Sequence, residues 1–255
     1  MPQKTYRITQ AILLAGLGIY LAHKLFSGTL YYYINERFFG LVAFGAAGFL
    51  VLAAALFLAR SRHVHAHADH GHDDHDDDAH DGSARGLNWG LFFVAVPLLL
   101  GVLVPESPLG ASAIANRGVS SDTPLTADAS RNPFQLAIPP NDRNILDWTR
   151  LYNFEPDPAA FNGETADVIG FVYKDERLGD GQFLVARFTV SCCVADAFAI
   201  GMAVDWPEAD ALDEISWVRV VGPVEVLELG DQTLPRIRAE MVQEVYQPDQ
   251  PYLFP

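Results

Sequence analysis

The chain has 255 residues and combines a formal net charge of −15 with a slightly positive mean hydropathy of +0.12. This acidity argues against a nucleic-acid partner, because phosphate binding requires a basic surface. The two cysteines are adjacent, which excludes a disulfide-dense scaffold. Charge divides along the chain: residues 1–62 carry a net +5, residues 63–81 carry −7 and residues 111–255 carry −13.

Three apolar stretches in the N-terminal part approach the length that crosses a bilayer. They cover about residues 8–26, 38–59 and 87–104, and a spanning helix needs roughly 20 apolar residues. The first could be a signal peptide, but no A-x-A-like cleavage site follows it. The third could be a buried core helix, but its internal Pro97 is better tolerated in a membrane helix. We expect two transmembrane helices within residues 1–60 and a third at 87–104.

The placement of Lys and Arg predicts the orientation of these helices. Five basic residues lie inside if the N-terminus is cytoplasmic, against two in the short outer loop, Lys24 and Arg37. Cytoplasmic loops carry the excess of positive charge. The expected protein is therefore a multi-pass protein of a bacterial cell membrane. Its N-terminus and second loop are cytoplasmic, and the chain beyond about residue 105 is extracytoplasmic.

The second loop, residues 61–86, is rich in histidine and aspartate and has no apolar periodicity, so we expect disorder. Imidazole is a good ligand for Zn, Cu, Ni or Fe, and carboxylates add oxygen donors. The loop is therefore a candidate labile site for zinc or another transition-metal ion, and the alternative is a solvated low-complexity linker. The candidate ligands are His63, His65, His67, His70, His72, His75 and His80.

The C-terminal part predicts a soluble β-rich domain at residues 134–255, which follows a Pro- and Ser-rich linker at 105–133. One short amphipathic helix is expected at 141–151, with Asn141 or Asp142 as its N-cap. Five strands are expected at 165–173, 182–191, 197–204, 217–228 and 235–246, with a short helix within 206–214. This order is that of a small OB-like barrel, and Gly170 and Gly222 allow the bending that such a barrel needs. The fold class is therefore α+β.

The adjacent cysteines, Cys192 and Cys193, fall at the end of the second expected strand, with Asp196 close by. Three interpretations stay open. The pair binds a metal ion together with Asp196, or it forms a strained, reducible vicinal disulfide, or it consists of two small buried residues. Neighbouring strand residues point to opposite faces, so both thiols reach one ion only if the strand ends or bulges there. No C-x-x-C pair, nucleophile elbow, P-loop or dinucleotide motif accompanies them, so no enzymatic activity is expected.

Several strings of the C-terminal part resemble the YcgQ-like family of permease subunits. They are Ile169–Tyr173, Val185–Phe188, Ser191–Ala197, Trp217–Val220 with Gly222, and Pro251–Tyr252. The most specific is Cys-Cys-x-Ala-Asp-Ala, and the N-terminal helix pair with its Tyr- and Arg-bearing link also looks similar. The resemblance implies a transport role beside a larger multi-helix permease, in some cases in a zinc-linked setting, and it names no substrate.

The expectation is an integral membrane accessory subunit of a two-component permease, linked to transport or homeostasis of a zinc-like metal ion. Its partners would be the larger permease subunit, the lipid bilayer and the metal ion. One alternative is a membrane-tethered binding, sensor or envelope assembly module with no transport role. A weaker alternative is a thiol-redox protein that uses the Cys192–Cys193 pair.

Overall fold

The structure, a computed structural model, describes residues 3–62, 83–110, 113–114, 118–119, 138–154, 156–229 and 232–255. The chain forms two compact units. The first holds residues 1–30 and 36–107, and the second holds residues 31–35 and 108–255. The short segment Tyr31–Asn35 thus belongs to the C-terminal unit, although it lies between two N-terminal helices in sequence.

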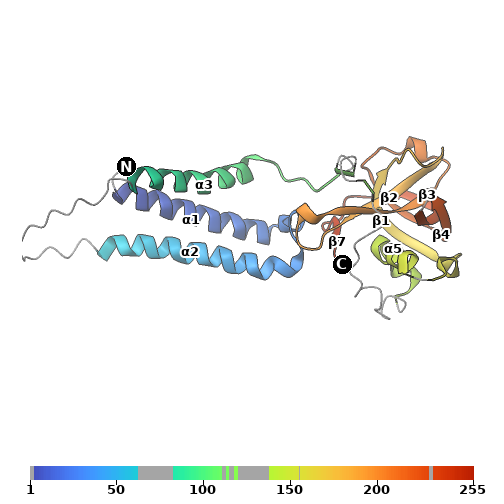
Figure 1. Cartoon of the computed structure of the whole chain (residues 1–255), viewed down its shortest axis with the longest axis horizontal. Helices are drawn as coiled ribbons and strands as arrows, with labels where there is room; N and C mark the ends of the chain where they lie inside the picture. The colour runs from blue at the N-terminus through green and yellow to red at the C-terminus, as the bar shows by residue number, and fades with distance from the viewer. Residues whose placement is uncertain are drawn as a thin grey trace, which may run out of the picture. The chain divides into compact units, whose positions relative to one another are not determined.

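The first unit contains three long helices that lie side by side (Figure 1): α1 (Gln3–Phe26), α2 (Phe39–Arg62) and α3 (Ser83–Leu103). Two stretches, Thr5–Phe26 and Glu36–Ala59, are long and apolar enough to cross a membrane, and α3 contributes the shorter apolar stretch Gly90–Leu103. Many of the large apolar side chains of α2 and α3 are exposed, among them Phe44, Leu58 and Phe93. The predicted N-terminal pair of apolar helices is confirmed.

Contacts between α1 and α3 follow the same direction along both helices. A Cβ on Gly16 would lie 3.3 Å from Leu98, and the Tyr20 hydroxyl donates a hydrogen bond to the carbonyl of Gly101, 2.9 Å away. One turn further on, the Lys24 ammonium forms an ion pair with Glu106, and the Lys24 side chain is buried. Because the later residues of α1 meet the later residues of α3, the two helices run parallel.

The second unit is built on a mixed sheet whose strands carry alternating Val, Ile and Phe. Its strands are β1 (Thr165–Tyr173), β2 (Gln182–Thr189), β3 (Phe198–Asp205), β4 (Trp217–Leu229), β5 (Gln232–Arg238), β6 (Met241–Glu244) and β7 (Tyr252–Leu253). Among these, β1 has the bounds that the sequence predicts. The α+β organisation expected from the sequence is confirmed.

The strand pairings form a closed series that begins and ends at β1. β1 pairs with β2, β2 with β3, β3 with β5, β5 with β4, and β4 with β1. Only the β3–β5 pairing in this series is parallel. Two short strands add to it: β6 pairs with the first half of β4, and β7 runs parallel to β2.

Two glycines sit where neighbouring strands approach most closely. A Cβ added to Gly170 in β1 would lie 2.6 Å from the carbonyl oxygen of Ala186, and one added to Gly222 in β4 would lie 2.2 Å from that of Arg238. Real Cβ atoms do not approach backbone oxygens this closely. Glycine is therefore required at both positions for the neighbouring backbone to approach this closely.

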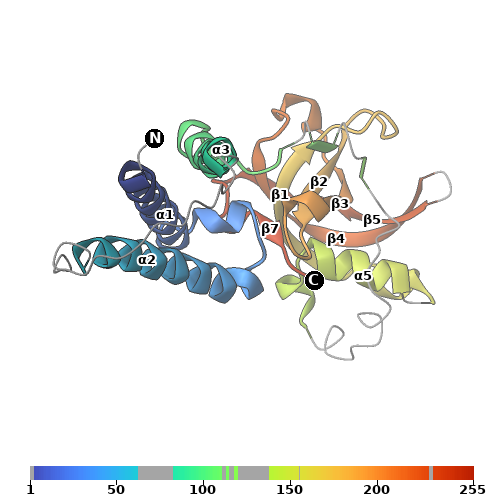
Figure 2. The ribbon, with the colours of Figure 1, turned by 60° about the vertical axis from the view of Figure 1, so that its left-hand side comes forward.

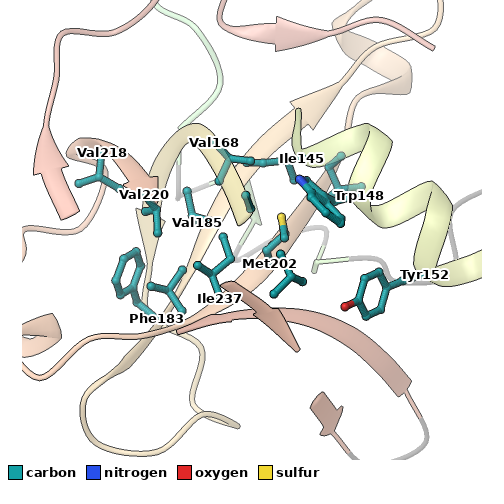
Figure 3. Packing of buried hydrophobic residues seen from close by; sticks show 14 of the residues in the cluster. Ile145, Trp148, Tyr152, Val168, Phe183, Val185, Met202, Val218, Val220 and Ile237 are labelled. Atoms are coloured by element: carbon teal, nitrogen blue, oxygen red, sulfur yellow. The ribbon is translucent and has the colours of Figure 1, made fainter. Parts of the chain in front are cut away.

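The main core lies between the sheet and the helix α5 (Ile145–Phe154), which packs against β3 and β5 (Figure 2). Trp148 is fully buried, and Figure 3 shows it among aliphatic side chains of the strands, with Met202 and Val185 nearby. The predicted helix start at Asn141 or Asp142 is wrong. Instead, the Asn144 side chain caps α5 by accepting hydrogen bonds from two backbone N–H groups, and Pro140–Asp142 forms a separate 3-10 turn, η4.

A second core covers another part of the sheet. Phe171 and Phe188 stack with ring centroids 5.7 Å apart, and Tyr252 of β7 packs edge-on against Phe188. Leu109 and Ile114, which follow α3, contribute to this second core. The described residues after the third apolar helix therefore pack onto the sheet.

The prediction of a single strand at 235–246 is wrong. The segment divides into β5 and β6, because the chain leaves the second half of β4 and crosses to its first half. The short helix expected within 206–214 is present as a 3-10 helix, η7 (Ala209–Ala211).

Candidate functional site

The cysteine pair lies in the connection between β2 and β3, which we call the Cys loop (Val190–Ala197). β2 ends at Thr189, and the loop closes with a 3-10 turn, η6 (Val194–Asp196). The strand has therefore ended before Cys192, and the rule that neighbouring side chains point to opposite faces no longer applies. This loop brings Cys192, Cys193 and Asp196 close together.

Asp196 organises the backbone of the Cys loop. Its two carboxylate oxygens accept hydrogen bonds from the backbone N–H of Ser191, 3.1 Å away, and of Cys192, 2.7 Å away. Burial acts to raise the pKa of Asp196, but these bonds and a hydrogen bond from the Cys192 thiol outweigh it and lower the pKa. The carboxylate is thus ionised, and it serves the loop as an internal cap.

Both cysteines are free thiols, with Cys192 exposed and Cys193 partly exposed, and their Sγ atoms lie 3.8 Å apart. The Asp196 carboxylate and, next in size, the Cys193 thiol raise the pKa of Cys192 to about 11. Cys192 is therefore protonated at neutral pH, and it is a poor nucleophile, because the thiolate is the reactive form.

The segment Tyr31–Asn35 lies along the Cys loop and holds its backbone. Ile34 forms an antiparallel β-bridge with Cys193, in which Asn35 N–H donates to the carbonyl of Cys192 (3.1 Å) and Val194 N–H donates to that of Tyr33 (2.9 Å). Sequence reasoning did not find this contact.

Asn35 is the central residue of this contact and is almost completely buried, with 1% of its surface exposed. Its amide nitrogen donates hydrogen bonds to the carbonyls of Ser191 (3.1 Å) and Val190 (3.5 Å). The only signal in the sequence is a polar residue in an aromatic link between two apolar helices, and this does not identify its partner.

The C-terminal strand fixes the other flank of the Cys loop. Val190 N–H donates to the carbonyl of Leu253, and the buried Arg187 in β2 donates to the carbonyls of Gln250 and Pro251. The guanidinium of Arg187 also lies 5.5 Å from the ring centre of Trp217, and burial lowers its pKa to about 10. The loop is therefore held on both sides by distant parts of the chain.

The other predicted ligands cannot be placed in this site. The seven histidines, His63 to His80, lie outside the described residues. Within the described ranges, no group of three or more His, Cys, Asp or Glu side chains is arranged to hold a metal ion. Metal binding by either set of residues stays a prediction.

Two family models match adjacent parts of the chain. The DUF1980 N-terminal domain matches residues 9–120, and the DUF1980 C-terminal domain matches residues 133–255. The chain therefore belongs to the DUF1980 family, as an α+β protein with apolar N-terminal helices.

Two curated relatives confirm the resemblance to YcgQ-like proteins. The UPF0703 protein YcgQ of Bacillus subtilis (strain 168) is 29% identical over 106 residues, which are 41% of this chain and 36% of that protein. A Streptococcus mutans serotype c protein named "Putative two-component membrane permease complex subunit" is 22% identical over 95% of this chain and 97% of its own length. No solved structure matches the chain.

Proposed function

We propose that the protein is an integral membrane accessory subunit of a two-component permease that handles a transition-metal ion such as zinc. The observation that carries the first part is the alignment with the Streptococcus mutans relative, which spans 95% of this chain and 97% of the relative. The metal is inferred from the residues themselves, namely the His- and Asp-rich residues 61–86 and the paired thiols of the Cys loop. The larger permease subunit would form the translocation path.

In this proposal α1, α2 and α3 all cross the membrane, with the N-terminus and residues 63–82 in the cytoplasm. Tyr31–Asn35 joins α1 to α2 and is also part of the second unit, so the second unit lies on the side of the membrane that holds this connection. Only an odd number of spans carries the chain from a cytoplasmic N-terminus to that side. The parallel contacts of α1 with α3 support a third crossing.

The two native cysteines allow a direct test of this orientation. In intact cells, a membrane-impermeant maleimide at mildly alkaline pH is expected to label the Cys192–Cys193 pair, because the second unit faces outward. As a control, Ala79→Cys in a Cys192→Ser/Cys193→Ser background is expected to react only after the cells are permeabilised. The opposite pattern would show that the orientation is inverted.

The extracytoplasmic domain would be an OB-like barrel that presents the Cys loop at one end. The ring of pairings from β1 through β2, β3, β5 and β4 back to β1 supports this, as does the parallel β3–β5 pairing. The net charge of −13 over residues 111–255 favours cations as its ligands. The His- and Asp-rich loop would buffer the same ion on the cytoplasmic side.

The permease role is tested by isolating the full chain, with an affinity tag, from its host membranes in a mild detergent. A multi-helix membrane protein is expected to co-elute in a fixed ratio to the chain, and the same tag on an unrelated three-span protein serves as the control. A chain that elutes without any other membrane protein would contradict the permease role.

A second function is a membrane-tethered sensor with no transport role. The bridge between the Cys loop and Tyr31–Asn35 favours it, because a ligand at the loop would act directly on the link between α1 and α2. Such a sensor would co-elute with soluble or envelope proteins instead of a multi-helix subunit. The thiol-redox alternative is disfavoured by the raised pKa of Cys192, which keeps the thiol protonated.

A further inference from the structure

We propose that Cys192 and Cys193 form an open two-thiolate site that accepts a thiophilic d-block ion and passes it to ligands of a partner protein. This inference rests on the proposed function and deepens it. It assigns the ligands as two sulfur atoms, gives Asp196 a positioning role, and leaves the remaining ligands to the partner.

The separation of the two sulfur atoms supports a shared ion. The Sγ atoms of Cys192 and Cys193 lie 3.8 Å apart. Two thiolates on one tetrahedral ion, with metal–sulfur bonds of about 2.3 Å, are separated by about 3.8 Å. A disulfide would place the sulfurs about 2.0 Å apart, and here the two cysteines are free thiols.

The backbone of the Cys loop is held in this arrangement before any ion binds. Asp196 accepts hydrogen bonds from two backbone N–H groups of the loop, and Asn35 donates hydrogen bonds to two of its backbone carbonyls. The β-bridge of Ile34 with Cys193 fixes the position between them. A site on a pre-organised backbone loses less conformational entropy on binding.

Asp196 is assigned a positioning role because its two oxygens accept the hydrogen bonds from Ser191 N–H and Cys192 N–H that shape the loop. No further His, Cys, Asp or Glu in the described ranges completes a metal-binding group. A tetrahedral ion on the two sulfurs therefore keeps two coordination positions open to water or to another protein.

The binding step is a proton exchange with no change of oxidation state. The ion M²⁺ forms two metal–sulfur bonds, and the two S–H protons pass to the solvent. Protons and the ion compete for the two sulfur atoms, so binding strengthens as the pH rises. A site that releases its ion after a small fall in pH is able to transfer the ion to another protein. A closed site with four protein ligands holds its ion more firmly and is typical of storage.

The test uses Co²⁺ as a spectroscopic substitute for the ion and the purified, reduced full chain in detergent. A sulfur-to-cobalt charge-transfer band is expected, and the carboxylates and imidazoles of residues 61–86 do not contribute to it. The band is expected to fall by about half in Cys192→Ser or Cys193→Ser and to vanish in the double variant. Ser191→Ala, in the same loop, is the matched control and keeps the full band. The apparent affinity is expected to rise between pH 6.5 and pH 8.5.

Two further measurements decide whether the site is open and what Asp196 does. Added imidazole is expected to shift the visible cobalt bands of the wild-type chain, because it fills the open positions. Asp196→Asn is expected to weaken binding while keeping the number of cobalt–sulfur bonds and the tetrahedral band shape. A wild-type chain that shows no sulfur band while a thiol assay finds both cysteines reduced would overturn the proposal. So would visible bands that do not respond to imidazole.

These outcomes are separate from those of the permease test. A sulfur band from a chain that co-elutes with no membrane partner would preserve the two-thiolate site and remove the permease role. A stable complex with a multi-helix permease whose accessory subunit gives no sulfur band would preserve the permease role and remove the two-thiolate site.

Discussion

Replacing Gly222 by alanine is expected to unfold the C-terminal domain at a markedly lower temperature. The new Cβ would lie 2.2 Å from the carbonyl oxygen of Arg238 and 3.1 Å from the Cα of Ala239. Both are backbone atoms at the end of the neighbouring strand β5, so no side-chain rotation relieves the clash. Strands β4 and β5 must therefore separate. We expect a loss of at least about 3 kcal/mol in the free energy of unfolding.

Thermal unfolding of the detergent-solubilised chain, followed by tryptophan fluorescence, measures this effect as a drop in Tm of about 10 °C or more. Gly179→Ala is the matched control. Its Cβ would meet only the flexible end of Gln182, 3.6 Å away, and its Tm is expected to change little. Equal stability of the two variants would show that the Arg238 carbonyl does not approach Gly222 as closely as described.

Replacing Asn35 by leucine is expected to release the segment Tyr31–Asn35 from the Cys loop. Leucine has the same number of side-chain heavy atoms and the same branching at Cγ, but it cannot donate hydrogen bonds, so the carbonyls of Val190 and Ser191 lose the bonds from Asn35. Each buried carbonyl left without a donor costs about 1–3 kcal/mol. The backbone contact between this segment and the loop is an isolated β-bridge, so we expect this loss to open it.

Limited proteolysis with chymotrypsin measures the opening, because the segment contains Tyr31, Tyr32 and Tyr33. Cleavage at these tyrosines in the purified chain is expected to be at least about tenfold faster in Asn35→Leu than in the wild type. Asn162→Leu changes an exposed asparagine of the same domain and is expected to leave the rate unaltered. If both variants are cut at the wild-type rate, the buried amide does not hold the segment.

The sequence predicts the local elements of this protein well. β1 has the predicted bounds, 165–173, because its alternating apolar residues are flanked by turn residues. The position of the cysteines just after β2 is also predictable, since the apolar alternation ends there. Patterns of this kind are local, and a single sequence contains them in full.

Contacts between residues that are distant in the sequence could not be predicted from it. The break between β5 and β6 has no glycine or proline to mark it, and it arises because Gly222 lets Arg238 approach β4. The contact of Asn35 with the Cys loop is a single β-bridge, which has no periodicity to detect. The sequence left three interpretations of Cys192 and Cys193 for the same reason. The conformation of their loop depends on hydrogen bonds with both Asp196 and Asn35.

The hydrogen bond between Asn35 and Ser191 joins residues 156 positions apart, and this separation has a consequence for how the protein is made. The α1–α2 connection is synthesised long before the strands that receive it exist. Contacts across such a separation form late, because a long loop must close first. We therefore expect the connection to stay undocked until β2, the Cys loop and β7 have folded, so that its docking is a late step in the folding of this domain.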